Sequence, residues 1–464
     1  MVTVSGVLVF FVVSLLIIQF LKLQWVRRRL PPGPTPYPFF GNLLQMNFRI
    51  HHENLKKMAK IYGNIFTLWV PQRPVVVLQG FQAVKEGLTV HAEDVAGRPT
   101  GGVMFSNGHL WKQQRRFGLA TMRKMGVGKK TQEYRLQEEA CHLVEYLQKT
   151  NGKPLDPTMP VVHAVANVIC SVIFGHRFSR DDENFHRLIE SIDAITAFGN
   201  SITFFVRKIS FVYFVKALLA KEVESHKEKR KADENRDFID YYLTEIDKTK
   251  GDAESTYDEE NLIQTIFDLF IAGTETTATT LRWALLFMAI YPDIQEKVQK
   301  ELDAVLGCSH VFCYEDRKKL PYTNAVVHEI QRYSNIILIA LPRLSLKDTE
   351  LLGYHVPKNT VILANIDSVL SDPGKWETPD QFNPGHFLDK DGNFVNREAF
   401  LPFAIGQRVC MGELLARMEL FIVFSTLLQA FTFTLPEGVK EVNTKFVFGS
   451  TMKPPPYQIC AVPR

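Results

Sequence analysis

Residues 403–412 read Phe-Ala-Ile-Gly-Gln-Arg-Val-Cys-Met-Gly, and good helix formers follow from Glu413 to Leu420. The two glycines allow the backbone to turn tightly and to approach a ligand closely. The N–H groups at the start of the following helix stabilise a negatively charged sulfur, and a cationic metal would complete the deprotonation of Cys410. Arg408 suits an anionic group on the same ligand. The stretch therefore predicts a thiolate ligand at a strand-to-helix transition.

These ten residues match every fixed position of the signature FxxGxRxCxG, and the stretch resembles the haem-binding loop of the cytochrome P-450 family. The resemblance implies that Cys410 is the axial thiolate of haem iron, and that Phe403, Gly406, Arg408 and Gly412 bind the haem. The alternative is a buried, inert cysteine. The resemblance covers essentially the whole chain and is closest to the vertebrate microsomal family-2 enzymes.

The composition sets outer bounds on the protein. A chain of 464 residues can bury a substantial core and a large cofactor. The length alone allows about three domains, although large single-domain enzymes break that rule. The net charge of +4 is modest, and we expect no nucleic-acid partner. The cysteines are scattered without a CxxC pair, which argues against disulfides and structural zinc and fits a reducing compartment: Cys141, Cys170, Cys308, Cys313, Cys410 and Cys460.

The N-terminus predicts a membrane anchor. Val2 to Leu21 is uncharged and apolar, which is long enough to span a bilayer as a helix. Basic residues follow at once, which favours an uncleaved single-pass anchor with a cytosolic body. Residues 30–38 are rich in proline and predict a stiff extended spacer. The predicted organisation is an anchor over residues 1–23, a basic and proline-rich linker over 24–41 and a catalytic domain over 42–464, in the endoplasmic reticulum membrane.

Trp111 and Arg115 lie four residues apart, so on a helix their N–H donors face the same anion. In the family this WxxxR pair contacts a haem propionate. By position, Arg98 and Arg343 also resemble propionate ligands. These interpretations depend on Cys410 being the haem ligand.

Seven basic residues and no acidic residue lie between Trp111 and Lys130. A basic patch steers an acidic partner, and in the family this partner is the flavoprotein reductase that passes on electrons from NADPH. A microsomal b-type cytochrome is a second expected partner. The alternative is a solvated helix and loop. The predicted basic face consists of Lys112, Arg115, Arg116, Arg123, Lys124, Lys129 and Lys130.

The apolar segment from Glu259 to Tyr291 predicts one long helix that crosses the core. Its middle contains a glycine and several threonines, which are poor helix formers. Hydroxyl groups that bond to the preceding turn can loosen the helix and leave room for O₂. Glu275 and Thr276 form an acid–alcohol pair that can deliver protons. The family pattern is matched here, and the alternative is a core or membrane helix with incidental threonines.

Glu329 and Arg332 lie three residues apart on a predicted helix and can form an ion pair. No second histidine completes an HExxH motif after His328, so a zinc peptidase is excluded. The pair matches the ExxR motif of the family. His386 stands where the third member of that network is usually arginine. We expect these three residues to hold the loop that presents Cys410.

The predicted substrate cavity is apolar. Residues 336–341 resemble the pocket-lining strand of the family, and a turn over 449–452 resembles a further pocket contact. A hairpin is also predicted over residues 65–79. The predicted substrate contacts are Phe267, Phe270, Ala272, Ile337, Leu341 and Thr451.

Two segments depart from the family pattern. Only thirteen positions separate Arg98 from Trp111, and the stretch over 194–223 lacks the usual proline-glycine linker. Both segments would roof the substrate entrance. Either the pocket is unusually open, or the protein folds poorly or binds haem poorly.

The sequence therefore predicts a mainly α-helical protein with small β-sheets, and a single large catalytic domain behind an N-terminal transmembrane anchor. The resemblance implies a monooxygenase with haem b that uses O₂ and NADPH electrons on lipophilic substrates, such as polyunsaturated fatty acids, steroids or xenobiotics. The alternatives are a haem-thiolate isomerase, which usually lacks the acid–alcohol pair, and a non-catalytic, haem-poor variant.

Overall fold

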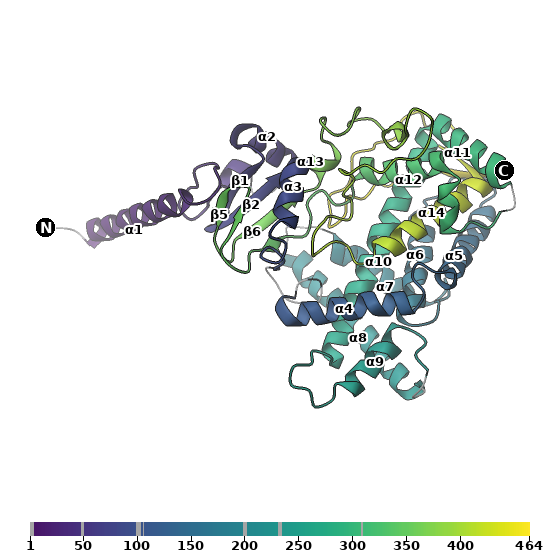
Figure 1. Ribbon diagram of the computed structural model, residues 1–464, viewed down its shortest axis with the longest axis horizontal. Coiled ribbons are helices and arrows are strands. Elements are labelled where there is room, and N and C mark those ends of the chain that lie inside the picture. The colour runs from purple at the N-terminus through teal and green to yellow at the C-terminus, as the bar shows by residue number, and fades with distance from the viewer. Residues whose placement is uncertain are drawn as a thin grey trace.

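The computed structural model of the protein describes residues 4–47, 51–98, 104, 106–197, 202–230, 234–307 and 310–464. Helices dominate, and a small sheet lies between the N-terminal helix and the main helical layer (Figure 1). The α-helices are α1 (Val4–Arg27), α2 (His52–Tyr62), α3 (Gly80–Thr89), α4 (Gly108–Lys124), α5 (Lys130–Gln148), α6 (Thr158–Ile173), α7 (Glu183–Thr196), α8 (Ile202–Lys229), α9 (Phe238–Lys248), α10 (Glu259–Ile290), α11 (Pro292–Leu306), α12 (Pro321–Ser334), α13 (Asp367–Leu370) and α14 (Glu413–Ala430).

The strands are short and form small sheets, as predicted. In the largest sheet the strand order is β1-β2-β6-β3. The predicted hairpin over residues 65–79 is confirmed, because β1 and β2 pair antiparallel with Ile65 opposite Leu78. The strands are β1 (Ile65–Val70), β2 (Arg73–Gln79), β3 (Arg343–Leu344), β4 (Thr349–Leu351), β5 (Tyr354–Val356), β6 (Val361–Asn365), β7 (Phe431–Thr434) and β8 (Cys460–Pro463).

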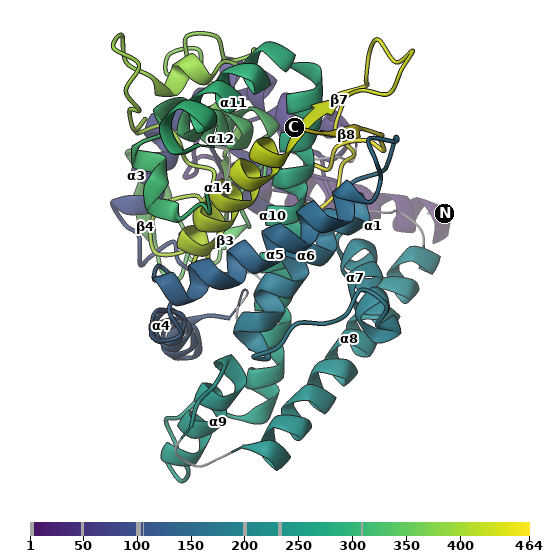
Figure 2. The ribbon, with the colours of Figure 1, turned by 90° about the vertical axis from the view of Figure 1, so that its right-hand side faces the viewer.

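Helix α10 crosses the centre of the helical layer, as the sequence predicts (Figure 2). It is 32 residues long and begins where the Asp258 side chain accepts a hydrogen bond from the N–H of Asn261. A Cβ atom added to Gly273 would lie 3.0 Å from the side chain of Ile169 on α6. The glycine therefore allows α6 to pack closely against α10. The helix stays continuous through its threonine-rich middle.

The segment over residues 336–341 differs from the predicted strand. Only a single bridge pairs Ile339 with Asn365, and the strand β3 begins two residues after the segment, at Arg343. Beside an isolated bridge, successive side chains need not point to opposite faces as they do in a strand. The segment nevertheless stays beside the sheet, since the Ala340 N–H donates to the carbonyl oxygen of Ala364 at 3.0 Å.

The proline-rich linker is docked on the body of the protein and is not a free spacer. The Thr67 N–H on the edge strand β1 donates to the carbonyl oxygen of Pro32 at 2.8 Å. A Cβ atom at Gly33 would stand 2.0 Å from the Thr67 carbonyl oxygen, so only glycine fits this contact. Leu30 at the end of the basic stretch packs with Trp69 in a small buried cluster. Helix α1 before the linker is apolar and exposed, with a mean hydropathy of 2.5.

The predicted shortening of the pocket roof lies partly outside the described residues. The residues that the structure does not describe are 99–103 and 105 in the first segment and 198–201 in the second. Helices α7 and α8 precede and follow residues 198–201 and lie side by side (Figure 2).

Candidate functional site

The loop before α14 presents Cys410 in a fixed conformation. Gly406 has a φ of +82°, and a Cβ atom there would lie 2.1 Å from the Leu88 carbonyl oxygen. Glycine is therefore required both by the backbone dihedral and by the close approach of α3. The Cys410 N–H donates to the Phe403 carbonyl oxygen at 3.1 Å. This bond closes the predicted loop, and Gly412 caps the start of α14. The predicted strand before the loop is wrong, because no strand lies in the fully described stretch between the end of β6 at Asn365 and the start of α14.

Cys410 as a whole residue is exposed, whereas protein atoms surround its sulfur closely enough to desolvate it. Desolvation by the surrounding protein raises the pKa of the Cys410 thiol, while the Gly412 N–H and the Arg115 charge oppose this rise. The protein alone therefore does not make Cys410 a thiolate. A cationic metal at the sulfur would, because a coordinated thiol is deprotonated.

Four arginines lie close to one another beside the loop, and all are at least half-buried. Desolvation, followed by repulsion from the neighbouring arginines, lowers the pKa of Arg343 and of Arg408 to about 9. The same causes lower the pKa of Arg98 to about 10. Within the described residues, no carboxylate forms an ion pair with any of the four, which are Arg98, Arg115, Arg343 and Arg408.

The Arg343 side chain is the least satisfied of the four. Its Nη2 donates to the Ile405 carbonyl oxygen at 2.9 Å. Its Nε and Nη1 are buried and have no hydrogen-bond partner in the part of the chain that the structure describes. Buried donors of a charged group are very seldom left unpaired. The cluster of four arginines is therefore built to receive an anionic ligand.

Backbone carbonyl groups fix the other arginines. Arg98 donates through Nη1 to the carbonyl oxygens of Leu341 and Pro342, at 2.7 and 2.8 Å. Arg115 donates to the Val409 carbonyl oxygen at 2.7 Å, directly before Cys410. The Arg408 guanidinium lies 3.8 Å from the ring centroid of Trp111. The structure thus brings together the predicted haem-binding residues on four separate segments of the chain.

The threonines of α10 bond back to the preceding turn. The Thr276 hydroxyl donates to the Ala272 carbonyl oxygen at 2.7 Å, and the Thr280 hydroxyl donates to the Thr276 carbonyl oxygen at 3.0 Å. This back-bonding was predicted, although the helix remains unbroken. Glu275 instead accepts a hydrogen bond from the Thr451 hydroxyl at 2.6 Å. The acid and the alcohol are thus neighbours in sequence whose side chains have different partners.

Some predicted substrate contacts face open space and others do not. Ala272 is exposed although it lies in the middle of a core helix, and Leu341 is 43% exposed. Ile337 and Phe267 are half-buried. Phe270 has no exposed surface and packs in the main core, so its contact with a substrate stays a prediction. Thr451 is also buried and contacts Glu275, because the C-terminal turn lies against α10.

Glu329, Arg332 and His386 form one buried network. Arg332 donates two hydrogen bonds to the Glu329 carboxylate, at 2.6 and 2.7 Å. Its remaining donors reach three carbonyl oxygens, so all five are satisfied. The His386 Nε2 accepts from the Thr378 N–H at 3.1 Å, which leaves Nδ1 to donate to Glu329 at 3.2 Å. Histidine thus fills the usual place of arginine as a neutral donor.

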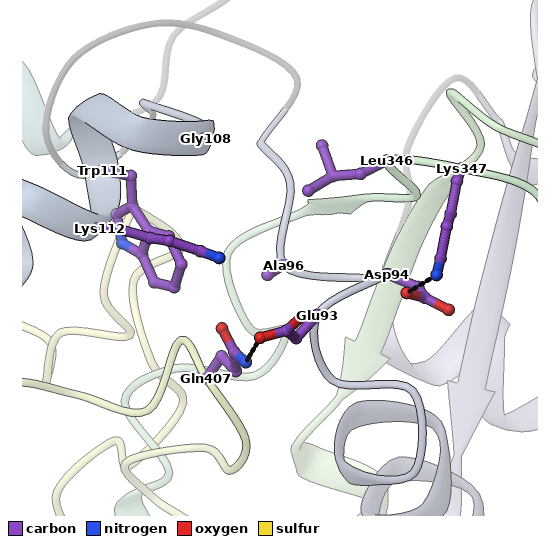
Figure 3. Close-up of a pocket in the computed structure, with 9 residues that line it drawn as sticks. All are labelled: Glu93, Asp94, Ala96, Gly108, Trp111, Lys112, Leu346, Lys347 and Gln407. Atoms are coloured by element: carbon purple, nitrogen blue, oxygen red, sulfur yellow. Dashed lines mark hydrogen bonds and ion pairs between the residues drawn. The ribbon is translucent and has the colours of Figure 1, made fainter. Parts of the chain in front are cut away.

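Six of the seven residues of the predicted basic face are exposed. Arg115 is the exception, since it turns inward to the cysteine loop. A cavity of about 270 Å³ lies beside the face. In Figure 3 the Lys112 side chain extends from α4 into this cavity, and Gln407 contacts Glu93 across it. The cavity has charges of both signs, because Asp94 and Lys347 also line it.

One residue near the site was not predicted. The Lys453 ammonium lies 3.1 Å from the Glu275 carboxylate. The only signal in the sequence is a basic residue in the turn that follows the predicted substrate contact Thr451.

Comparison with known proteins identifies the family. The cytochrome P450 family model matches residues 31–461. Cytochrome P450 2J2 of Homo sapiens is 43% identical over 98% of this chain and 95% of that protein, and cytochrome P450 2C25 of Mesocricetus auratus is 41% identical over 98% and 99%. The alignment with the human protein spans 483 positions, more than the 464 residues here, so this chain lacks residues present in that relative. By sequence and by site, the chain belongs to the cytochrome P450 family.

Proposed function

We propose that the protein is a membrane-anchored, unspecific monooxygenase. It inserts one oxygen atom from O₂ into lipophilic compounds, such as polyunsaturated fatty acids, steroids or xenobiotics, by hydroxylation or epoxidation. The observation that carries the proposal is the arginine cluster beside Cys410, in which buried donors of Arg343 have no partner among the described residues. Such a site suits a flat ligand whose metal binds the cysteine and whose carboxylates bind the arginines.

The residues present fit haem b, the cofactor that the family uses with O₂ and with NADPH electrons from a reductase. Cys410 would bind the iron, and the four arginines with Trp111 would hold the two propionates. Phe403, Gly406 and Gly412 would allow the loop to approach the ring closely. Haem bound in this way activates O₂, and the cysteine thiolate favours cleavage of the O–O bond.

The contribution of α10 is proton supply and an apolar surface. Thr276 holds a hydroxyl proton at the middle of the helix, and Glu275 provides a buried carboxyl group one residue away. Ala272, Ile337 and Leu341 offer apolar surface that excludes water and favours a lipophilic substrate. The buried network of Glu329, Arg332 and His386 would hold the loop that presents Cys410.

Helix α1 supports the membrane location. Its exposed, uncharged length would anchor residues 1–23 in the endoplasmic reticulum membrane, with the catalytic domain over 42–464 on the cytosolic side. The linker over 24–41 would then hold the domain at the membrane, because it is docked on β1. The exposed basic residues of α4 and the following loop would receive the reductase, and a b-type cytochrome could use the same face.

Two measurements test the proposed function. A red-shifted Soret band of the reduced, carbon monoxide-bound protein is expected if Cys410 ligates haem, and its absence would favour the haem-poor alternative. Product formation that requires NADPH and added reductase is expected for a monooxygenase. Turnover without reductase would instead support the isomerase. A screen of lipophilic compounds for the high-spin spectral shift would then identify the substrate class.

A further inference from the structure

One lysine joins the proposed proton-delivery acid to an exposed carboxylate. The Lys453 ammonium contacts the Glu275 carboxylate on α10 at 3.1 Å and also the Asp193 carboxylate near the end of α7. The Glu275 and Lys453 side chains are 10% and 14% exposed, whereas the Asp193 side chain is 73% exposed. The ammonium is therefore shared between a buried carboxylate and one at the surface.

The turn that carries Lys453 is held on both sides by backbone groups. The Ser450 N–H donates to the Thr196 carbonyl oxygen on α7 at 2.8 Å. The Trp283 indole N–H on α10 donates to the Met452 carbonyl oxygen at 2.8 Å. Lys453 is thus fixed between two helices, unlike a surface lysine with a mobile side chain. A displacement of the end of α7 would move Asp193 relative to the ammonium.

The same contacts hold Glu275 away from its neighbour in sequence. The Glu275 Oε1 atom accepts from Lys453 and from the Thr451 hydroxyl, while the Thr276 hydroxyl donates to the Ala272 carbonyl oxygen. Glu275 must leave Lys453 before its carboxyl group can turn toward Thr276. An ammonium left unpaired in a largely buried site is strongly unfavourable. Asp193 removes that obstacle, because it retains the ammonium when Glu275 turns away.

We propose that Lys453 is a positioning residue for Glu275, and that Asp193 makes the release of Glu275 possible. The proposal rests on the proposed function, in which Glu275 and Thr276 supply protons to the site. It also links the end of α7, beside the proposed pocket roof, to proton delivery on α10. A bound substrate that shifts α7 would change how the ammonium is shared between the two carboxylates.

The first test needs no catalytic activity. The haem-loaded protein is treated with an amine-acylating reagent, and peptide mass spectrometry follows the modification of Lys453. We expect slow modification of Lys453 compared with Lys347, which is 68% exposed and pairs with Asp94 at the surface. Asp193→Asn should accelerate the modification of Lys453 about threefold or more and leave Lys347 unchanged. Equal rates at the two lysines in the unaltered protein would overturn the proposal.

The second test measures where the NADPH electrons go. When proton delivery is misdirected, two electrons and two protons reduce O₂ to hydrogen peroxide and no product forms. Lys453→Met should raise the ratio of peroxide to product about threefold or more, Lys453→Arg should restore most of the coupling, and Lys347→Met should change nothing. All variants should keep the red-shifted carbon monoxide spectrum. Absence of that spectrum in the unaltered protein would refute the proposed function. An unchanged ratio of peroxide to product in Lys453→Met, with the spectrum intact, would refute only the role of Lys453.

Discussion

Arg343→Met should stabilise the haem-free protein and weaken its hold on haem. Arg343 is buried among other arginines, and two of its donor atoms lack partners in the described part of the chain. Without an anionic ligand, the charge is a source of instability. With haem bound, the same charge would pair with a propionate. Methionine keeps most of the aliphatic volume and removes the charge. The substitution should therefore raise the stability of the haem-free protein and lower the affinity for haem.

The magnitude follows from the surroundings of the guanidinium. Desolvation, with repulsion from Arg98 and Arg115, lowers the pKa of Arg343 from its ordinary value to about 9, which corresponds to about 5 kcal/mol of unfavourable free energy at neutral pH. Relaxation and water penetration reduce this amount, and the bond to the Ile405 carbonyl oxygen is lost in the variant. We expect a net gain of about 2 kcal/mol in the free energy of unfolding of the haem-free protein.

The assay compares urea unfolding of the haem-free protein with the rate of haem transfer to an excess of an apo-globin. Loss of one buried charged hydrogen bond should cost about 2 kcal/mol or more of binding free energy, so haem should leave about 30-fold faster from Arg343→Met. Arg73→Met is the matched control, since Arg73 is exposed at the start of β2. If Arg343→Met destabilised the haem-free protein, or retained haem as firmly as the unaltered protein, the assignment of the arginine cluster to the propionates would be wrong.

Three further predictions concern stability. Arg332→Lys should lower the free energy of unfolding by about 3–5 kcal/mol, because three ammonium donors cannot replace five buried guanidinium bonds; a urea midpoint equal to that of Arg73→Lys would contradict this. Gly406→Ala should lower the melting temperature and the haem content together, since a Cβ atom would lie 2.1 Å from the Leu88 carbonyl oxygen; normal haem content would contradict the requirement for glycine. His163→Phe should stabilise the protein at acid pH, because desolvation lowers the pKa of His163 from 6.5 to about 4 and both ring nitrogens are buried without a partner among the described residues. Between these pKa values the unfolded chain binds the extra proton, so stability falls as pH falls through the window, by about 1 kcal/mol from about pH 7.5 to about 5.5. The variant should lose this part of the pH dependence, whereas His355→Phe at an exposed position should not, and urea unfolding at the two pH values compares them.

Local patterns in the sequence predicted the parts of the protein that depend on neighbours along the chain. The cysteine loop, the β1–β2 hairpin and the long helix α10 are of this kind, because turn residues, β-branched runs and continuous apolar stretches act over a few positions. The ExxR pair was predicted for the same reason, since its members are one turn apart.

Contacts between distant segments were predicted only where the family resemblance supplied them, as for the arginine cluster and for His386 with Glu329. Helical spacing places Phe270 and Ala272 on α10, but it does not reveal which face meets the core and which meets the site. Lys453 reaches Glu275 only because the C-terminal turn packs on α10, and no local pattern encodes that packing. Arg115 belongs to a basic run, and only its spacing from Trp111 in the WxxxR motif indicated that it turns inward, toward the cysteine loop.

The close fit of Gly33 on Thr67 bears on how the protein can be shortened. The N-terminal segment covers Trp69 and occupies the open side of β1, the outermost strand of its sheet. A version that began after Leu30 would uncover this indole, and one that began after residue 41 would also leave the Thr67 amide without its acceptor. Uncovered strand edges invite self-association. Soluble versions should therefore retain the residues from Leu23 onward and lose only the apolar turns before them.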